Sequence, residues 1–173
     1  MPQDFILSEV TKSDLKIIQI NRKYKPVKQK YGLFLRGERI SQKKYLPDLQ
    51  ALMREKYTQL HCATFTRWEL GYIDPPINIV SFWAECLDLK LNINIYSPDR
   101  RLIGANWKDQ LVLLRKDDRV SLEVVAKQVG VQRALIAQWE QNPTNKYPNE
   151  PELKDWAIAL GVEAEFVFER KST

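Results

Sequence analysis

The sequence contains few of the residues that catalytic and metal centres usually need. Its 173 residues include one histidine, two cysteines and six glycines. A Ser-His-Asp set is not credible with a single histidine, and the two cysteines, which lack CxxC spacing, suit neither a zinc site nor a disulfide framework. There is no glycine-rich phosphate loop. We therefore expect no enzyme, no bound metal and no cofactor, and two unmodified thiols favour a reducing, cytoplasmic setting.

Long hydrophobic runs are also lacking. No stretch approaches the roughly 18–20 apolar residues that a membrane span requires. The N-terminus has an acidic residue before a very short apolar run and no small-residue cleavage site, so it does not resemble a signal peptide. These features predict a cytoplasmic protein without a membrane partner, long enough for one or two small cores.

Positive charge is in excess and is unevenly distributed. The formal net charge is +5 and the pI is about 9.1. Residues 16–44 contain ten basic residues against the single acid Glu38, whereas residues 109–173 are slightly acidic. A concentrated basic region suits a polyanionic partner and would supply non-specific attraction to phosphates. A solubilising basic face explains the charge equally well, so charge alone leaves both alternatives open.

One short pattern occurs twice. Residues 64–71, TFTRWELG, and residues 135–142, LIAQWEQN, each carry a Trp-Glu pair near their end. Three further blocks align around these pairs in the same order: FLRGER with LLRKDD, LPDLQALM with LEVVAKQV, and IVSFWAECLDL with ELKDWAIALGV. Four helix-like blocks that occur twice in one order predict two related domains.

The second copy has clear helix boundaries. Ser121 is a typical N-cap for the amphipathic stretch LEVVAKQV, in which Val124, Val125 and Val129 have helical spacing. Gly130 is a typical C-terminal residue for this helix, and a second helix begins after a very short turn. In that second helix the side chains expected to face outward are Arg133, Ala134, Ala137 and Gln138, opposite Ile136 and Trp139.

These features resemble the lambda-repressor/Cro-type (Xre-family) helix-turn-helix domain. The resemblance covers residues 107–162. It rests on Val125-Ala126, the Gly130-Val131 turn, Trp139-Glu140 and the final ALGV. Residues 31–89 are a looser match, because they lack the turn glycine and have Gln50 where the family usually has alanine. The resemblance implies a mainly α fold of two tandem helix-turn-helix domains.

Short accessory β-strands are expected around the helices. Stretches rich in Ile, Val, Phe and Tyr occur near the N-terminus, after the first copy and at the C-terminus, and they predict strands that extend or join the domains. The expected organisation is a basic, strand-containing extension (1–30), a divergent first domain (31–91), a strand and linker (92–106), and a second domain with a C-terminal strand (107–173).

The resemblance also implies the residues that contact DNA. In this family the second helix of the pair enters the major groove. In the second domain Arg133 would bind guanine and Gln138 adenine. The implied DNA-binding residues of this domain are Ser121 and Lys146 for phosphates, Arg133, Ala134 and Gln138 for bases, and Gln132 at the helix cap. The matching residues of the first domain are His61, Cys62, Ala63, Thr64 and Arg67.

The implied function is a transcriptional regulator that binds double-stranded DNA, by family analogy a repressor. The alternative is an antitoxin or adaptor that uses one domain to bind a partner protein, which the acidic balance of residues 109–173 favours. Family members usually bind as two-fold dimers, so a homodimer and an intrachain pseudo-dimer both remain open.

The repeated Leu-Arg and Trp-Glu pairs carry one further prediction. We expect Arg36 to bond Glu69 and Arg115 to bond Glu140, so that each pair ties a first helix to a recognition helix through charge-assisted hydrogen bonds.

Overall fold

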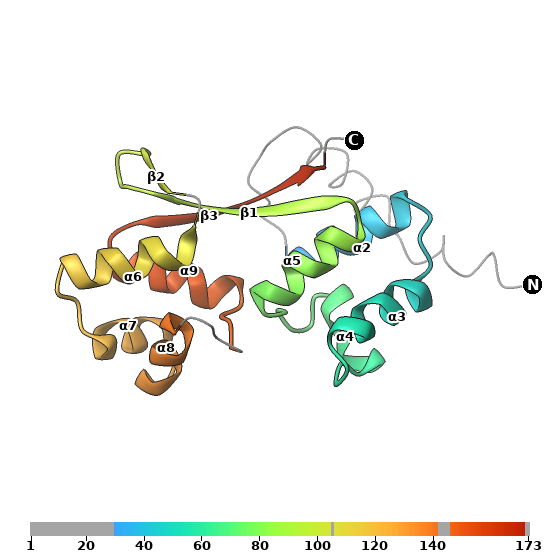
Figure 1. Ribbon diagram of the computed structural model, residues 1–173, viewed down its shortest axis with the longest axis horizontal. Coiled ribbons are helices and arrows are strands. Elements are labelled where there is room, and N and C mark those ends of the chain that lie inside the picture. Colours follow the sequence, from blue (N-terminus) through green and yellow to red (C-terminus); the bar gives the residue numbers. More distant parts are fainter. Residues whose placement is uncertain (1–29, 105, 142–145, 172–173) are drawn as a thin grey trace, which may run out of the picture.

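The computed structural model describes residues 30–104, 106–141 and 146–171 (Figure 1). Within these ranges the protein is mainly helical, as expected, and its strands form one three-stranded antiparallel sheet. The strands expected within residues 1–30 lie outside the described part of the chain. In the described part, no helix combines the length and apolar character needed to cross a membrane.

The helices of the described ranges form two sets of four, each followed by a long strand. The first unit contains α2 (Tyr31–Ser41), α3 (Leu46–Lys56), α4 (Cys62–Glu69), α5 (Ile77–Cys86) and strand β1 (Leu89–Tyr96). A short strand, β2 (Leu102–Gly104), leads to the second unit, which contains α6 (Trp107–Asp117), α7 (Leu122–Val129), α8 (Arg133–Glu140), α9 (Glu150–Ala159) and strand β3 (Glu163–Arg170).

Local capping explains where the second unit's helices begin and end. The Ser121 hydroxyl accepts a hydrogen bond from the Val124 amide at the start of α7, and Gly130 ends that helix with φ of 77°. Asn149 and Glu152 form a reciprocal capping box at the start of α9. The expected N-cap and C-terminal glycine of α7 are confirmed. Val124, however, is 54% exposed and lies off the buried face.

The two units match helix by helix. Helices α2 and α6 both have 11 residues, α4 and α8 both have 8, and α5 and α9 both have 10. The turn after the first helix contains a residue of positive φ in each unit: Lys43 in the first unit and Arg119 in the second. Helix α3 is longer than α7 and is followed by a loop, because the first unit has no glycine to end the helix where α7 ends.

The expected bond between Arg36 and Glu69 is wrong. Both carboxylate oxygens of Glu69 accept hydrogen bonds from Arg39, one helical turn further on. Arg39 occupies the same position in α2 that Arg115 occupies in α6, so the correct alignment of the two helices differs from the expected one by three residues. The second expected pair, Arg115 with Glu140, is confirmed.

The sheet joins the two units. Strands β1 and β3 pair antiparallel over eight residues, with Ile93 opposite Phe166, while β2 pairs with the other edge of β1. Ile93 lies as many residues beyond Leu87, the C-cap residue of α5, as Phe166 lies beyond Leu160, the C-cap residue of α9. Equivalent residues of the two units therefore face each other, which is the relation that an approximate two-fold axis produces.

A second contact has the same symmetry. Pro76 and Asn149, the N-cap residues of α5 and α9, form an antiparallel bridge. At the end of the sheet, Arg170 of β3 reaches the buried carboxylate of Glu38 in α2 at 3.0 Å. The two units are thus connected through the sheet, through the starts of α5 and α9, and through an ion pair.

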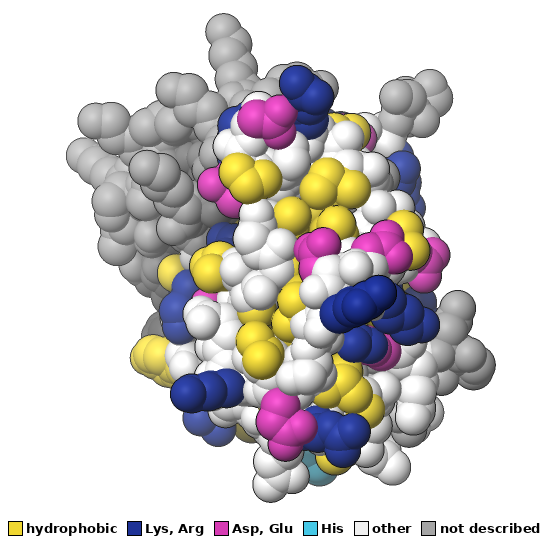
Figure 2. All heavy atoms as spheres, turned by 90° about the vertical axis from the view of Figure 1, so that its left-hand side faces the viewer, with side chains coloured by type: hydrophobic (Ala, Val, Ile, Leu, Met, Phe, Trp, Pro, Cys, Tyr) yellow, Lys and Arg dark blue, Asp and Glu magenta, His cyan; other side chains and the backbone are white. Residues whose placement is uncertain are grey.

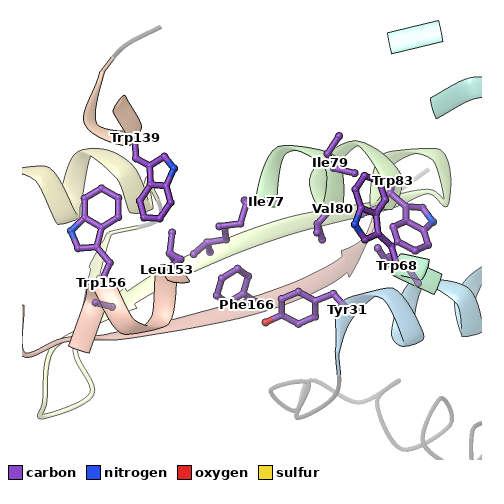
Figure 3. Packing of buried hydrophobic residues seen from close by; sticks show 14 of the residues in the cluster. Tyr31, Trp68, Ile77, Ile79, Val80, Trp83, Trp139, Leu153, Trp156 and Phe166 are labelled. Carbon is purple, nitrogen blue, oxygen red and sulfur yellow. The ribbon is translucent and has the colours of Figure 1, made fainter. Parts of the chain in front are cut away.

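One continuous hydrophobic core runs through both units beneath the β1–β3 pair. Ile77, Leu153, Phe166 and Tyr31 fill its centre, between the tryptophans of the second unit and those of the first (Figure 3). The ring centroids of Tyr31 and Phe166 lie 5.1 Å apart. Burial and a hydrogen bond to the Glu150 carboxylate raise the pKa of Tyr31. Four tryptophans are buried in this core: Trp68, Trp83, Trp139 and Trp156.

Candidate nucleic-acid interface

Helices α4 and α8 lie on the same face of the molecule, opposite the sheet (Figure 1). Each is held from behind by buried side chains, Phe65 and Trp68 in α4 and Ile136 and Trp139 in α8. An α-helix buries only one stripe of its surface, and the exposed side chains of these two helices include Cys62 and Arg67 in α4 and Arg133 and Ala134 in α8. The two helices that sequence reasoning assigned to DNA therefore share one surface.

In the second unit, the expected cap residue Gln132 is exposed, and so are two of the three expected base-contacting residues, Arg133 and Ala134. Gln132 is the N-cap residue of α8, although its side chain makes no capping hydrogen bond. Gln138 differs from expectation, because it is half-buried and its Oε1 atom is shielded from solvent. Its assignment to adenine stays a prediction that requires this side chain to turn outward.

Arg133 has a neighbour that sequence reasoning missed. Its Nε atom lies 3.4 Å from a carboxylate oxygen of Glu123, in the first turn of α7, and both side chains are well exposed. An exposed ion pair of this kind contributes about 0–1 kcal/mol. The carboxylate also adds negative charge next to the start of α7. In the sequence, the only indication of this contact was that Glu123 is an acidic residue in the first turn of a helix.

The expected phosphate-binding residues of the second unit are Ser121 and Lys146, and both are exposed. The Ser121 hydroxyl already accepts the capping hydrogen bond of α7, so its own O–H remains the group that could donate to a phosphate. Lys146 lies in the segment that leads to α9.

In the first unit, the expected residues lie along the outer face of α4. His61 is the N-cap residue, again without a side-chain capping bond, and Thr64 is half-buried. The three other expected residues are exposed: Cys62, Ala63 and Arg67. Arg67 lies in the last turn of the helix. With His61, four of the five expected side chains are therefore exposed.

An arginine-glutamate pair fixes the end of each of these helices. In the first unit Arg39 Nε donates to Glu69 Oε1 at 2.7 Å and Nη2 to Oε2 at 3.0 Å, with side chains only 6% and 3% exposed. Arg39 Nη1 also donates to the Lys44 carbonyl oxygen at 3.0 Å. One guanidinium thus holds the last residue of α4 and the turn before α3.

The second unit repeats this geometry. Arg115 makes two hydrogen bonds to Glu140 and a third, at 3.0 Å, to the Val120 carbonyl oxygen. The hydrogen bond to Glu140 raises the pKa of Arg115. This pair is slightly more exposed, at 14% and 12%. Both pairs are positioning elements, because they face the interior and set the orientation of α4 and α8.

Much of the described part of the basic run has structural contacts. Besides the buried Arg39, Lys30 donates to the Gly71 carbonyl oxygen at 2.8 Å, and Lys44 donates to that of Cys86 at 2.7 Å. Residues 16–29 lie outside the described part of the chain. On the end of the second unit, hydrophobic, basic and acidic side chains are interspersed (Figure 2). Phosphate attraction by residues 16–44 stays a prediction.

A cavity of about 440 Å³ lies between the units, bordered by α5, β1 and the start of α6. Its lining mixes aromatic rings with single charges, including Lys56 and Glu85. The Lys56 ammonium lies 4.1 Å from the centre of the Phe82 ring. Within the described ranges, no group of three or more His, Cys, Asp or Glu side chains could hold a metal ion.

Most of the side chains that sequence reasoning assigned to DNA belong to α4, to α8 or to their N-cap residues, and none of them lines the cavity. Comparison of the chain with protein-family models, with curated proteins and with solved structures finds no match.

Proposed function

We propose that the protein binds double-stranded DNA in a sequence-specific manner and regulates transcription. In this proposal α3–α4 and α7–α8 are two helix-turn-helix pairs of the lambda-repressor/Cro type, and α4 and α8 are the recognition helices. The observation that carries the proposal is that both helices lie on one face, in two units whose equivalent residues meet across the β1–β3 pair. Duplex DNA presents its major groove to one side once in every turn, which suits two such helices.

The chemistry of α8 supports the proposal. Arg133 projects from the first turn of the helix, and Ala134 beside it is small enough for the helix to approach the base edges closely. A guanidinium can bond the O6 and N7 atoms of guanine together. Because the Arg133–Glu123 pair is exposed, exchanging Glu123 for a base would cost little.

Selection from a pool of randomised duplexes tests the proposal. We expect a defined sequence to emerge, and we expect its affinity to fall steeply as the salt concentration rises, because bound phosphates release counterions. Recovery of a pool without sequence preference, or binding that is insensitive to salt, would contradict the proposal.

Replacing Arg133 by alanine should remove discrimination at one base pair of the selected site. The expected loss is about 1–3 kcal/mol at that position, with thermal unfolding unchanged because the side chain is exposed. Competition binding with every single-base variant measures it. Arg101→Ala is the matched control, since Arg101 is also exposed and ion-paired but directly precedes β2, a strand on the side of the molecule opposite α8 (Figure 1). Unchanged specificity in the folded Arg133→Ala variant would refute this assignment.

Thiol alkylation tests whether α4 also contacts the duplex. Cys62 is exposed at the first position of α4, whereas Cys86 is half-buried and burial raises its pKa. We expect Cys62 to react first, and we expect saturating selected duplex to protect it while the slow reaction of Cys86 is unchanged. Cys62→Ser isolates the slow reaction. Equal reactivity of Cys62 with and without DNA would show that α4 stays outside the groove.

A second candidate function is binding to a partner protein, as in an antitoxin or an adaptor. The specific observation in its favour is Glu123 beside Arg133, since a carboxylate near a recognition helix repels phosphate. The same selection separates the two: a protein-binding module would enrich no duplex sequence.

A further inference from the structure

Resting on the proposed function, we infer that the DNA site is non-palindromic and is bound by a single chain, with α4 and α8 reading different half-sites. A two-fold dimer of identical chains presents the same residues to both half-sites, and its operator is correspondingly symmetric. In this protein the arrangement is two-fold but the two reading surfaces differ.

The contacts that would join two chains are made within one chain. The eight-residue pairing of β1 with β3 is centred on Ile93 and Phe166, and both of these side chains are buried. The bridge between Pro76 and Asn149 lies at a second pair of equivalent residues. The surface that relates the two units is therefore already occupied, and the spacing of α4 and α8 is set without a second copy.

The two recognition helices keep the same interior face. The final Trp-Glu pair is buried or nearly buried in both, and in each it is preceded three residues earlier by a buried apolar side chain, Phe65 or Ile136. Both helices are eight residues long and both end at a glutamate held by an arginine of the unit's first helix. They are thus anchored alike, so residues at equal distances from the two Trp-Glu pairs can be compared.

Equivalent positions of the two helices differ in chemistry, and at one of them also in exposure, since Arg67 is exposed and Gln138 is half-buried. Counted back from the Trp-Glu pairs, Cys62 in α4 corresponds to Arg133 in α8, and Arg67 corresponds to Gln138. A thiol is a weak donor and cannot form the bidentate bond that Arg133 can form with guanine. The guanidinium is in the first turn of α8 but in the last turn of α4. One half-site sequence cannot satisfy both helices.

The experiment compares the selected duplex with two symmetrised duplexes, each made of one half-site and its inverted copy. We expect the parent duplex to bind at least about tenfold more tightly than either symmetrised form. We also expect sedimentation of the complex to give one chain per duplex. The double variant Cys62→Arg with Arg67→Gln gives α4 the residues of α8 at the two compared positions, so it should prefer the duplex that carries two α8 half-sites. Thermal unfolding of this variant checks that it is folded.

The outcomes separate the inference from the function on which it rests. A palindromic selected site, or two chains on one duplex, overturns the inference and leaves sequence-specific DNA binding standing. A failure to select any sequence overturns the proposed function, and the inference with it. A folded double variant that still prefers the parent duplex overturns the assignment of unequal half-sites to these positions.

Discussion

Replacing Glu69 by glutamine should lower the free energy of unfolding by about 3–5 kcal/mol. The variant keeps the shape of the side chain but leaves the charge of Arg39 buried without its counter-charge, at a site where both side chains are less than a tenth exposed. It also disturbs the guanidinium that holds the Lys44 carbonyl oxygen. Urea denaturation, followed by tryptophan fluorescence, measures the loss.

The second unit supplies the matched control for this prediction. Glu140→Gln breaks the equivalent pair, whose members are 14% and 12% exposed, so water can replace part of the lost interaction and the loss should be smaller. The combined variant Arg39→Met with Glu69→Leu should recover most of the stability, because apolar side chains can replace a buried ion pair. If Glu69→Gln and Glu140→Gln lowered the free energy of unfolding equally, the more buried Arg39–Glu69 pair would not contribute more to stability than the Arg115–Glu140 pair, contrary to this prediction.

Replacing Gly32 by alanine should destabilise the protein by about 3 kcal/mol or more. A Cβ atom at this position would lie 1.8 Å from the Trp68 carbonyl oxygen, and this is a backbone atom that cannot rotate away. Helices α2 and α4 would have to separate, which would disturb the buried Arg39–Glu69 pair that joins them. Thermal unfolding monitored by circular dichroism would show a large fall in melting temperature.

Gly130→Ala is the control for this substitution. Gly130 has φ of 77°, and a methyl group added there would meet no heavy atom of the described residues within 4 Å. Its replacement therefore introduces left-handed strain alone, about 1–2 kcal/mol. In an unconstrained helix Gly→Ala raises stability by up to about 1 kcal/mol. A Gly32→Ala variant as stable as the parent would show that α2 and α4 are not closely packed.

The sequence allowed the helices of the second unit to be predicted well because their signals are local. Ser121 and Gly130 mark the ends of α7 through bonds made within a few residues. The error at Arg36 has a different origin. Residues three apart in a helix lie on nearly the same face, so a hydrophobic pattern leaves the alignment of two helices uncertain by one turn. Only the observed starts of α2 and α6 identify Arg39.

The positions of β1 and β3 could be predicted, but not that they pair with each other, and β2 formed in a segment expected to be a linker. The alternation in LNINIY and EAEFVF is visible in the sequence, while the pairing of Ile93 with Phe166 joins residues far apart in the chain and depends on how two whole units pack. The same holds for the Arg133–Glu123 contact and for the shielded oxygen of Gln138, since both depend on how α7 and α8 cross.

The pairing of β1 with β3 also has a consequence for refolding. These strands belong to different units, and residues 97–106, which include β2, are the chain that connects the units. A second copy carries the same two strands, so β1 of one chain can pair with β3 of another without any new type of contact, which is domain swapping. Refolding at high concentration should therefore yield closed, exchanged dimers as well as monomers, whereas dilution before refolding favours the monomer.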